Sequence, residues 1–489
     1  GGPAGPSASG SAHALLLDAE DLRSSWQPDL AVAVPELPPA TDCPDADGDG
    51  FPSALACPAL PPDRADCDDD DPAVTPATER WVRPGPFLMG SASSHAGQDE
   101  QPVHVVTLSG YCLDRSEVTV AAWAAWMRAA GRTPQGPDVR SITDTLEPEA
   151  GRERMPAEGV TWQEARDFCA AMGKALPTEA QWEKAARGGC DLGQDPAACD
   201  PDDLRPYPWG GARPTCALAN HQDTSSGMPR LCVSDTLPVD TLPAGAGPYG
   251  HLHLAGNVWE YVADVYHPQV YTQAPRTDPG GPVDGSFHVM RGGSWNTFST
   301  NMRAANRFHD LVMGSASGIR CARPTVAPTP DTVAPLAMAT LRGTVSIDNG
   351  SLSGRALYVT AFDAADVDPR TGGMAFGRSP MAETRLVPGG GRSQDFELQV
   401  PQGRSYFVTA ALDAGTGARK DDYVSASGSG GFGEAEGNPI TADGAVDGIR
   451  IRLRPPPQGL GPAGPPPGPA GAAGPPDGAS SGGRPGAPR

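Results

Sequence analysis

The chain has 489 residues, too many for one hydrophobic core, and 61 glycines and 55 prolines make up nearly a quarter of it. Its formal net charge of −22 argues against nucleic acid and anionic membranes as partners and favours a divalent cation as counter-charge. No apolar run approaches the roughly 20 residues of a membrane-spanning helix. We therefore expect two or three domains joined by stretches without a packed core.

The cysteines indicate an oxidising compartment. There are ten, an even number, at irregular spacing and without a CxxC pair, so disulfides are favoured over zinc. The chain begins at Gly1 rather than Met, which we interpret as removal of a signal segment, although a truncated chain would look the same. We expect an exported protein: periplasmic, extracellular, or an outer-membrane lipoprotein anchored through a removed upstream cysteine.

Composition divides the chain into six segments. They are a disordered tether (1–41), an acidic metal-binding segment (42–79), a globular domain (80–324), a proline-rich linker (325–337), a β-sandwich (338–454) and a Pro/Gly-rich disordered tail (455–489). The glycines of the tail break the every-third rule, which excludes a collagen triple helix. The expected fold class is α+β for the globular domain and all-β for the segment that follows it.

The acidic segment carries the start of a calcium loop. Alternating carboxylates occupy positions 1, 3 and 5, a glycine occupies position 6, and a backbone carbonyl is the next candidate ligand. These ligands are Asp45, Asp47, Asp49 and the carbonyl of Phe51. Position 12, where an EF-hand has a bidentate Glu, is Ala56, so an EF-hand proper is excluded.

A second acidic run supplies the oxygens that this loop lacks. Its candidates are Asp66, Asp68 and Asp69, which a Cys57–Cys67 disulfide would bring back to the first loop. The arrangement resembles short acidic, cysteine-bearing repeats of exported bacterial proteins, DxDGDG followed by DCDD, that are taken to bind calcium. A solvated acidic linker is the alternative, and we favour calcium.

The globular domain begins with strand patterns at 87–90 and 101–104 and a helix start at 117–119. Two capping boxes then open helices: Thr161 with Glu164, and Thr178 with Gln181. After the second helix, short motifs replace regular structure. They are Tyr207-Pro208-Trp209-Gly210, Ala219-Asn220, Gly256-Asn257-Val258-Trp259-Glu260, Arg291-Gly292-Gly293-Ser294-Trp295 and Gly318-Ile319-Arg320-Cys321.

These ordered motifs, together with GKALPTEAQWE at 173–183, resemble the formylglycine-generating (sulfatase-modifying factor) family over the whole globular domain. The resemblance implies a variant of the C-type lectin fold with two helices, few strands and much irregular chain. It also implies a bond between Cys169 and Cys321. Proximity alone suggests two further pairs, Cys190–Cys199 and Cys216–Cys232, and it leaves Cys43 and Cys112 as a possible pair.

The family's calcium sites carry over in part. The first would use Asn220 with Asp223 or Asp235 in place of the family's later Asp. The second would use the carbonyls of Gly256 and Val258 and the carboxylate of Glu260. His253, a poor calcium ligand, stands where the family has Asn or Asp. The alternative is that Asn257 and Glu260 satisfy buried backbone groups in a loop-rich core.

The family's copper ligands are missing. Aerobic members oxidise a substrate cysteine with a copper ion held by two thiolates, for which a hydroxyl is no substitute. The first thiolate position is Thr297, and no cysteine lies between Cys232 and Cys321. Met302 alone would make a feeble site. We therefore assign no catalytic residue and expect neither copper nor formylglycine synthesis.

Other reaction types find little support. Relatives that carry this domain beside an iron-binding helical bundle, as in sulfoxide synthases of thiohistidine biosynthesis, need several helix-borne histidines. Of nine histidines, only His13 precedes the domain. Four others fall in the same half of it: His251, His253, His288 and His309. A transition-metal site among these is conceivable, and hydrogen bonding in loops is favoured.

Once the family's reaction is excluded, the function that the resemblance still implies is ligand binding in a groove. In the family, the area that receives a peptide is surrounded by the positions of Trp259, Arg291, Trp295, Thr297 and Arg303. Aromatic and arginine side chains are types that anchor binding. The alternatives are core packing for the tryptophans and structural ion pairs for the arginines.

The C-terminal segment has five strand patterns at sandwich spacing. They lie at 341–345, 356–362, 395–400, 406–411 and 449–453. The segment resembles prealbumin-like and carboxypeptidase-regulatory-like modules, which favours a spacer or adhesion role.

The sequence thus predicts an exported, calcium-stabilised modular protein whose globular domain binds a peptide, protein or glycan ligand or serves as a scaffold. The alternative is an enzyme of the same fold with an altered reaction on a peptide substrate.

Overall fold

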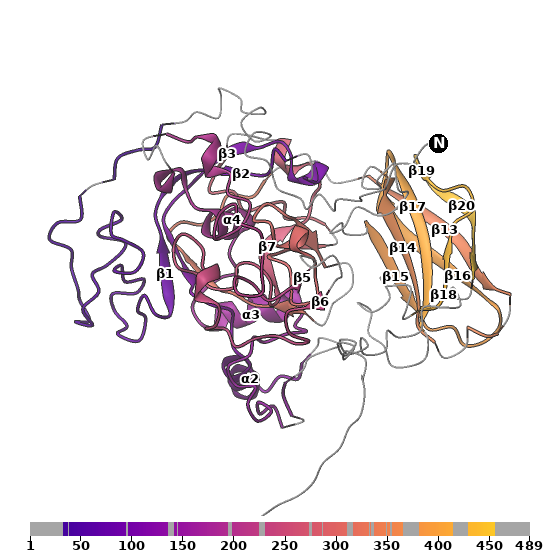
Figure 1. Cartoon of the computed structure of the whole chain (residues 1–489), viewed down its shortest axis with the longest axis horizontal. Coiled ribbons are helices and arrows are strands. Elements are labelled where there is room, and N and C mark those ends of the chain that lie inside the picture. The colour runs from indigo at the N-terminus through magenta and orange to yellow at the C-terminus, as the bar shows by residue number, and fades with distance from the viewer. Residues whose placement is uncertain are drawn as a thin grey trace, which may run out of the picture.

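The computed structural model describes residues 33–454, with gaps. The gaps are 38, 94–95, 135–140, 144, 194–197, 224–229, 273–275, 286, 311–315, 332, 334–336, 349, 353–354, 365–380 and 414–428. Most of the predicted tether and the whole predicted tail lie outside the described residues. Figure 1 shows one body with the helices and much irregular chain, and a second body made of strands. No helix of the described part is long and apolar enough to cross a membrane.

The α-helices of the described residues lie in the first body: α2 (Val120–Ala129), α3 (Trp162–Ala171) and α4 (Glu179–Arg187). Both predicted capping boxes are present, and they begin α3 and α4. A Thr119 side chain accepts the Ala122 N–H at the start of α2. Every residue of α4 is buried, so this helix runs through the centre of the body.

Short sheets surround α4. One has the order β1-β4-β12, a second β10-β9-β7-β11, a third β2-β3-β8, and a fourth is the pair β5-β6. The strands are β1 (Glu79–Val82), β2 (Gly85–Met89), β3 (His104–Leu108), β4 (Tyr111–Asp114), β5 (Gln222–Asp223), β6 (Arg230–Leu231), β7 (Trp259–Val265), β8 (Arg276–Thr277), β9 (His288–Arg291), β10 (Phe308–His309), β11 (Ser317–Gly318) and β12 (Ala322–Pro324). Short 3-10 helices link them: η2 (Gln98–Glu100), η3 (Cys190–Leu192), η4 (Pro201–Asp203), η5 (Pro243–Gly245), η6 (Val270–Thr272) and η7 (Ser299–Met302). The first body is thus rich in short strands and loops, with few helices.

The second body consists of two sheets. One has the order β16-β13-β20, and the other β15-β14-β17-β18, with β19 also paired to β17. The strands are β13 (Met338–Ile347), β14 (Leu357–Asp363), β15 (Ala382–Leu386), β16 (Ser393–Pro401), β17 (Arg404–Asp413), β18 (Ser429–Glu434), β19 (Ile440–Ala442) and β20 (Val446–Leu453). All five predicted strands are present, whereas β15, β18 and β19 were not predicted. Their short runs are rich in polar residues and glycine, so they show weak strand patterns.

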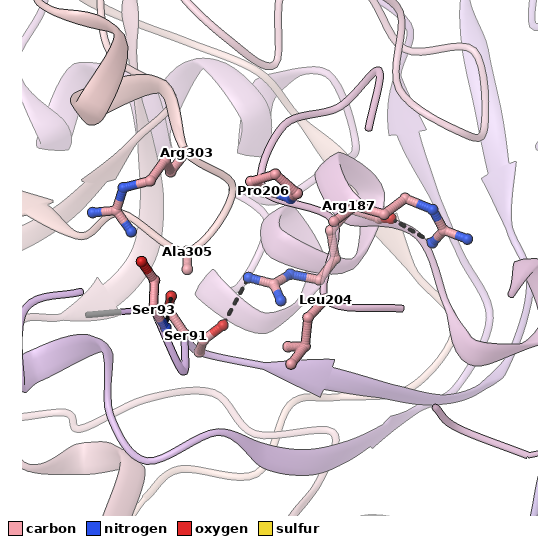
Figure 2. A pocket seen from close by; sticks show the side chains of 9 residues that line it. Ser91, Ser93, Arg187, Leu204, Pro206, Arg303 and Ala305 are labelled. Carbon is pink, nitrogen blue, oxygen red and sulfur yellow. Dashed lines mark hydrogen bonds between the residues drawn. The ribbon is translucent and has the colours of Figure 1, made fainter. Parts of the chain in front are cut away.

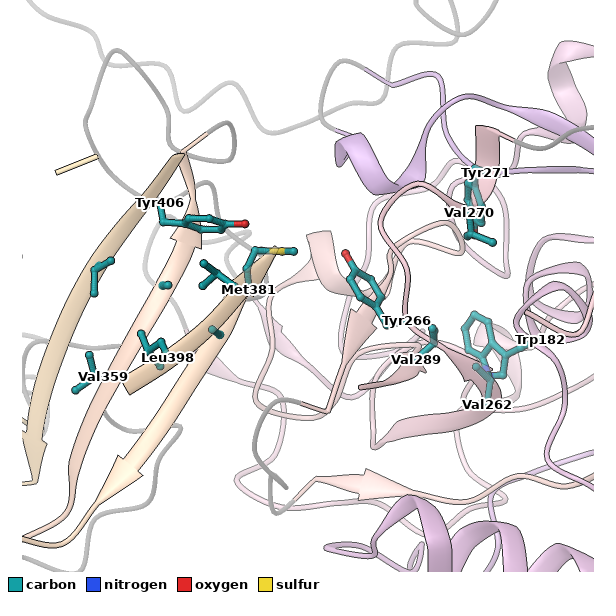
Figure 3. Close-up of a cluster of buried hydrophobic side chains, with 14 of the residues drawn as sticks. Trp182, Val262, Tyr266, Val270, Tyr271, Val289, Val359, Met381, Leu398 and Tyr406 are labelled. Atoms are coloured by element: carbon teal, nitrogen blue, oxygen red, sulfur yellow. The ribbon is translucent and has the colours of Figure 1, made fainter. Parts of the chain in front are cut away.

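Buried side chains form one large cluster that runs through both bodies. Figure 3 shows its two parts, with Trp182, Val262 and Val289 in the first body and Val359 and Leu398 in the second. Tyr266 and Met381 lie where the two parts approach each other.

The predicted linker is not free along its whole length. Thr329 pairs with Pro279 in a parallel bridge, in which the Thr329 N–H donates to the Asp278 carbonyl at 2.7 Å. Asp331 forms an ion pair with Arg276 at 2.6 Å, and both side chains are about nine-tenths buried. The linker therefore leaves the first body along this docked stretch.

The ten cysteines form five disulfides, and none is free. Three expected pairs are present: Cys169–Cys321, Cys190–Cys199 and Cys216–Cys232. The expected Cys57–Cys67 bond is wrong, as is the pairing of Cys43 with Cys112. The structure has Cys43–Cys57 and Cys67–Cys112 instead. Nearness in sequence misled the prediction because Cys67 lies against β4, 45 residues away along the chain.

Candidate functional site

The acidic loop brings its first three carboxylates together. Oxygen atoms of Asp45, Asp47 and Asp49 all lie within 4.8 Å of one another. The Gly48 and Gly50 N–H groups donate to the Asp45 carboxylate at 2.9 and 3.2 Å, which fixes the turn. Both glycines have positive φ, a conformation that side chains with a Cβ rarely adopt. The backbone therefore holds three negative charges at one point.

Asp66 joins this group from the second acidic run. It is 1% exposed, and Oδ2 atoms of Asp47, Asp49 and Asp66 are buried without a hydrogen-bond partner. Burial, assisted by the charges of Asp49 and Asp47, raises the pKa of Asp66 to about 6. Three converging carboxylates, with Asp66 close enough to feel two of their charges, are a set of oxygen donors for a hard divalent cation.

A backbone bridge returns the second run to the loop, a role that the sequence analysis gave to a disulfide. Ser53 and Asp66 form a parallel bridge, with the Ala54 N–H donating to the Asp66 carbonyl at 2.8 Å. Asp69 also reaches the loop, since its Oδ1 accepts the Ala46 N–H at 2.9 Å. Asp68 turns elsewhere and forms an ion pair with Arg323 at 2.9 Å.

Phe51 follows the loop directly. Its N–H donates to Asp49 Oδ1 at 2.7 Å, and its side chain is half-buried. This bond keeps the Phe51 peptide beside the carboxylates, as a carbonyl ligand requires.

The predicted groove arginines are buried ion pairs. Arg291 in β9 has no exposed surface, contacts Glu183 and the Asn306 carbonyl, and lies 5.3 Å from the Trp182 ring centroid. A side chain so placed cannot touch a ligand, because its terminal nitrogens bind protein atoms and no surface remains. Of the two roles considered for Arg291, structural pairing is the one the structure has.

Arg303 follows η7 and is equally engaged. Its two terminal nitrogens donate to both oxygens of Glu100, at 2.5 and 2.7 Å. Arg303 and Arg187 line a cavity of about 10 Å³, with Ser91 and Ser93 on one side (Figure 2). This volume holds one water molecule and no larger ligand.

The two tryptophans of the predicted groove are mostly buried. Trp259 is 6% exposed and stacks on Phe308 with ring centroids 4.4 Å apart. Trp295 is 7% exposed, and its indole N–H has no hydrogen-bond partner among the described residues. Core packing accounts for Trp259, and the unpartnered indole N–H of Trp295 is itself buried.

Thr297, at the family's first thiolate position, is half-buried beside the same segment. Its hydroxyl donates to the Ser294 carbonyl at 3.0 Å and accepts the Ser294 N–H at 2.9 Å. This hydroxyl closes a turn. Copper does not fit here, since every cysteine is in a disulfide and the nearby donors are hydroxyl and backbone groups.

The residues of the family's second calcium site are taken up by protein contacts. Glu260 in β7 is fully buried, and Arg320 donates to its two oxygens at 2.6 and 2.8 Å. The Trp182 indole N–H donates to the same carboxylate at 2.6 Å. Gly256 and Val258 precede it in a buried turn. Since a guanidinium neutralises Glu260, these residues do not form a site for calcium.

The first family site is also altered. Asn220 is fully buried, donates to the Asp235 carbonyl at 2.9 Å, and has a side-chain oxygen without a partner. The Asp235 carboxylate is occupied by Arg152 at 2.7 Å, and Asp223 contacts Arg230 at 3.3 Å. Asn220 keeps one free oxygen, and both candidate carboxylates have cationic partners.

The four histidines do not come together. His253 lies 3.2 Å from the Thr241 hydroxyl, and burial lowers its pKa to about 4. His288 lies 3.0 Å from Asp310 and stacks on Trp162. Within the described part of the chain, no group of residues close enough to hold a metal includes a histidine.

Sequence reasoning missed the acids that neutralise the buried arginines. Glu100, Glu179 and Glu183 have almost no exposed surface, and Glu179 binds Arg307 at 2.7 and 2.9 Å. Glu117 is also buried, which raises its pKa to about 7, and it accepts a hydrogen bond from the Asn257 amide at 2.9 Å. Apart from Glu183 and Arg187, four residues apart on α4, these ion pairs join residues far apart in the chain, so no local pattern indicates them.

Comparison with known proteins places this geometry in context. The sequence family described as "Sulfatase-modifying factor enzyme 1-like domain" matches residues 67–325. "Serine/threonine-protein kinase pkn1" of Chlamydia caviae is 30% identical over 257 residues, which are 50% of this chain and 37% of that protein. "Formylglycine-generating enzyme" of Streptomyces coelicolor is 29% identical, over 51% of this chain and 91% of that protein. "Hercynine oxygenase" of Mycolicibacterium smegmatis is 30% identical, over 50% and 61%.

Proposed function

We propose that this chain, which belongs to the sulfatase-modifying factor enzyme 1-like family, uses the family fold as a binding or scaffold module in an exported protein. It does not act as a formylglycine-generating oxidase. One observation carries the proposal: the thiolate position is Thr297, whose hydroxyl closes a turn, and no cysteine lies between Cys232 and Cys321.

The ion-paired interior of the globular domain supports a function that depends on the shape of the fold. The buried pairs Arg291–Glu183, Arg303–Glu100 and Arg320–Glu260 keep the motifs in place without a metal. A surface held by such a framework is suited to bind a peptide, protein or glycan. The segment around Thr297, which is half-buried and follows Trp295, is the part of the predicted groove that we assign to that ligand.

We assign calcium to the acidic loop. The ligands we propose are Asp45, Asp47, Asp49, Asp66, Asp69 and the carbonyl of Phe51. The carboxylate convergence and the buried, unpartnered oxygens support this assignment. Calcium there would neutralise charges that the described residues leave without a cation.

The second body, in our proposal, is a β-sandwich module of the exported type that serves as a spacer or adhesion domain. Its two sheets and the alternation of buried and half-buried residues in β14 support this. Five disulfides in the structure support an oxidising, non-cytoplasmic location.

The test is a peptide assay. The purified full chain is incubated with copper, oxygen and a peptide containing Cys-x-Pro-x-Arg, and the peptide mass is followed. The formylglycine-generating enzyme of Streptomyces coelicolor is the positive control. We expect no conversion of the cysteine by this chain. Conversion above the level of copper alone would overturn the proposal.

An enzyme with an altered reaction is the second candidate. It is favoured by the relatives whose names are those of enzymes, hercynine oxygenase among them. Turnover of a peptide substrate that is lost on Trp295→Ala, with the fold retained, would favour this candidate over a binding module.

A further inference from the structure

Arg80 and Arg115 form a positive group that the proposed function does not use. Arg80 lies in β1, and Arg115 follows the last residue of β4. Both side chains are half-buried. Their Nε atoms are buried and have no hydrogen-bond partner in the described structure, and a terminal nitrogen of Arg80 donates to the Pro62 carbonyl at 3.5 Å.

The other arginines of the domain show how unusual this is. Within the described residues of 80–324, each further arginine that is not exposed has a carboxylate within 4.0 Å. These are Arg83, Arg152, Arg187, Arg205, Arg276, Arg291, Arg303, Arg307, Arg320 and Arg323. Arg80 and Arg115 have no such partner among the same residues, although the chain has a net charge of −22. Both guanidinium groups are half-buried and no carboxylate of these residues pairs with them, so the group can accept an anion from solution.

Strand pairing brings the two side chains together. Arg80 pairs with Leu113, and the Arg115 N–H donates to the Thr78 carbonyl at 2.8 Å, two residues further along the same pair of chains. Diagonal neighbours of this kind share a face, and like charges at such positions repel. The positive charge of Arg115 lowers the pKa of Arg80, after the larger effect of burial.

The neighbouring loop confirms that the local potential is positive. Gly250 packs so closely that a Cβ there would lie 3.3 Å from Arg80 Nε, and the Leu252 N–H donates to the Arg115 carbonyl at 2.8 Å. His251 between them is fully buried. Burial first, and then nearby arginines including Arg80 and Arg115, hold its pKa well below the usual range. The acid that acts on Arg80 is the exposed Asp63, which forms no ion pair with it.

We propose that Arg80 and Arg115 bind a tetrahedral oxyanion, a phosphate or sulfate group, at the side of β1 that borders the acidic segment (Figure 1). Two guanidinium forks offer paired N–H donors that match the oxygens of such a group. A doubly charged anion balances the two cations. Both arginines sit on paired strands, so the site exists before the anion arrives.

The experiment measures the melting temperature of the full chain in sodium phosphate or sulfate against sodium chloride of equal ionic strength. Isothermal titration with inorganic phosphate gives the affinity. Arg80→Gln and Arg115→Gln remove one fork each. Arg64→Gln is the matched control, because Arg64 is exposed and lies in the neighbouring segment.

We expect phosphate and sulfate to raise the melting temperature of the wild type and of Arg64→Gln. Affinity falls roughly ten- to hundredfold in Arg80→Gln and Arg115→Gln, as expected for loss of a charge-assisted hydrogen bond. In anion-free buffer these two variants melt at or above the wild type, because a like-charge repulsion is gone. This second readout also shows that they fold.

Equal responses of all four proteins would overturn the proposal, as would a wild-type response to phosphate no larger than that to chloride. Phenyl phosphate distinguishes the source of the group. If phenyl phosphate binds as tightly as inorganic phosphate, the site accepts a phosphate ester on a partner molecule. If phenyl phosphate is excluded, the site accepts a free ion. Either of these results supports the site.

Discussion

Buried charge is compensated differently in the interior of the globular domain and in the acidic segment. In the domain, buried cations meet carboxylates from distant parts of the chain, as Arg320 meets Glu260 and Arg307 meets Glu179. In the segment, Asp45, Asp47, Asp49 and Asp66 face one another, and none of them has an ion pair in the described structure. In the first region the described arginines that are not exposed, other than Arg80 and Arg115, have carboxylate partners in the chain, whereas these four carboxylates have no cationic partner among the described residues.

This difference separates two kinds of stability. The domain's motifs are held by ion pairs whose two partners belong to one chain, so we expect them to be less sensitive to chelator than the acidic segment. The segment concentrates the demand for a cation in a small region that borders β1 (Figure 1). The effect of a metal on stability should therefore be confined to the acidic segment. Four experiments test this difference between the two regions.

The largest effect is expected from breaking a pair in the interior. Arg320→Met leaves the fully buried Glu260 carboxylate without its cation. Removal of one partner of a buried pair costs about 3–5 kcal/mol, so the first body should melt at a much lower temperature in scanning calorimetry. The double variant Arg320→Met with Glu260→Met removes both charges and should recover part of the loss. A loss below about 1 kcal/mol for the single variant would contradict the view of a self-balanced interior.

The covalent connection between the two regions is next. Cys67→Ser with Cys112→Ser frees the segment from β4 and removes a disulfide, which typically contributes about 2–4 kcal/mol. We expect the thermal transition that calcium shifts to become distinct from the melting transition of the domain. Cys43→Ser with Cys57→Ser is the control, since it opens a bond within the segment and leaves the segment attached. If neither variant shows a calcium-dependent transition separate from the melting of the domain, the two regions do not unfold independently.

Calcium itself should act through Asp66. At a concentration a hundredfold above its dissociation constant, a bound ion adds about 2.7 kcal/mol to the free energy of unfolding. The Asp66 pKa of about 6 is above the ordinary value of 3.8, so its contribution to the calcium-free protein is present at low pH and is lost as pH rises towards and past 6. The stabilisation by calcium should therefore grow between pH 5 and pH 7, measured by thermal melting with and without chelator.

Asp66→Asn should abolish most of this calcium response, and without calcium it should melt no lower than the wild type at pH 7. Asp70→Asn, an exposed neighbour, is the matched control and should respond as the wild type does. Indifference of the wild type to both calcium and chelator would remove the calcium assignment.

The smallest effect is expected from an ion pair in water. Arg342 and Glu397 join β13 to β16 at 2.9 Å, with side chains 48% and 52% exposed. Arg342→Met should leave the melting temperature close to that of the wild type, because water screens this pair. Set beside Arg320→Met, it tests whether burial, rather than pairing alone, makes the interior costly to break. A loss of stability as large as that of Arg320→Met would show that burial is not what makes the interior pair costly to break.

Local sequence patterns identified much of the fold. The capping boxes at Thr161 and Thr178 mark α3 and α4, because a cap and its partner lie three residues apart and are visible in any window. The convergence of Asp45, Asp47 and Asp49 was visible for the same reason, because these carboxylates alternate within five residues. The five strongest strands of the second body showed alternating residues that face a core and solvent.

What the sequence concealed depends on contacts between distant residues. Arg303 and Glu100 are 203 positions apart, so the sequence analysis left ligand contact open for an arginine that the interior uses. Cys67 was paired with its sequence neighbour because nothing local indicates β4. Arg80 and Arg115 become a group only through the register of β1 and β4. In each case the fold brings together residues whose positions in the chain are unrelated.

The docked stretch of the linker has a mechanical consequence. Thr329 and Asp331 lie parallel to 278–281 and are held there by backbone hydrogen bonds and by Arg276. A pull on the second body, with the first held, runs along this strand and loads those bonds together in shear instead of opening them one after another. If the protein joins a surface to a partner, tension between the two would reach the framework around Asp278 and Gly281 before it reached either core.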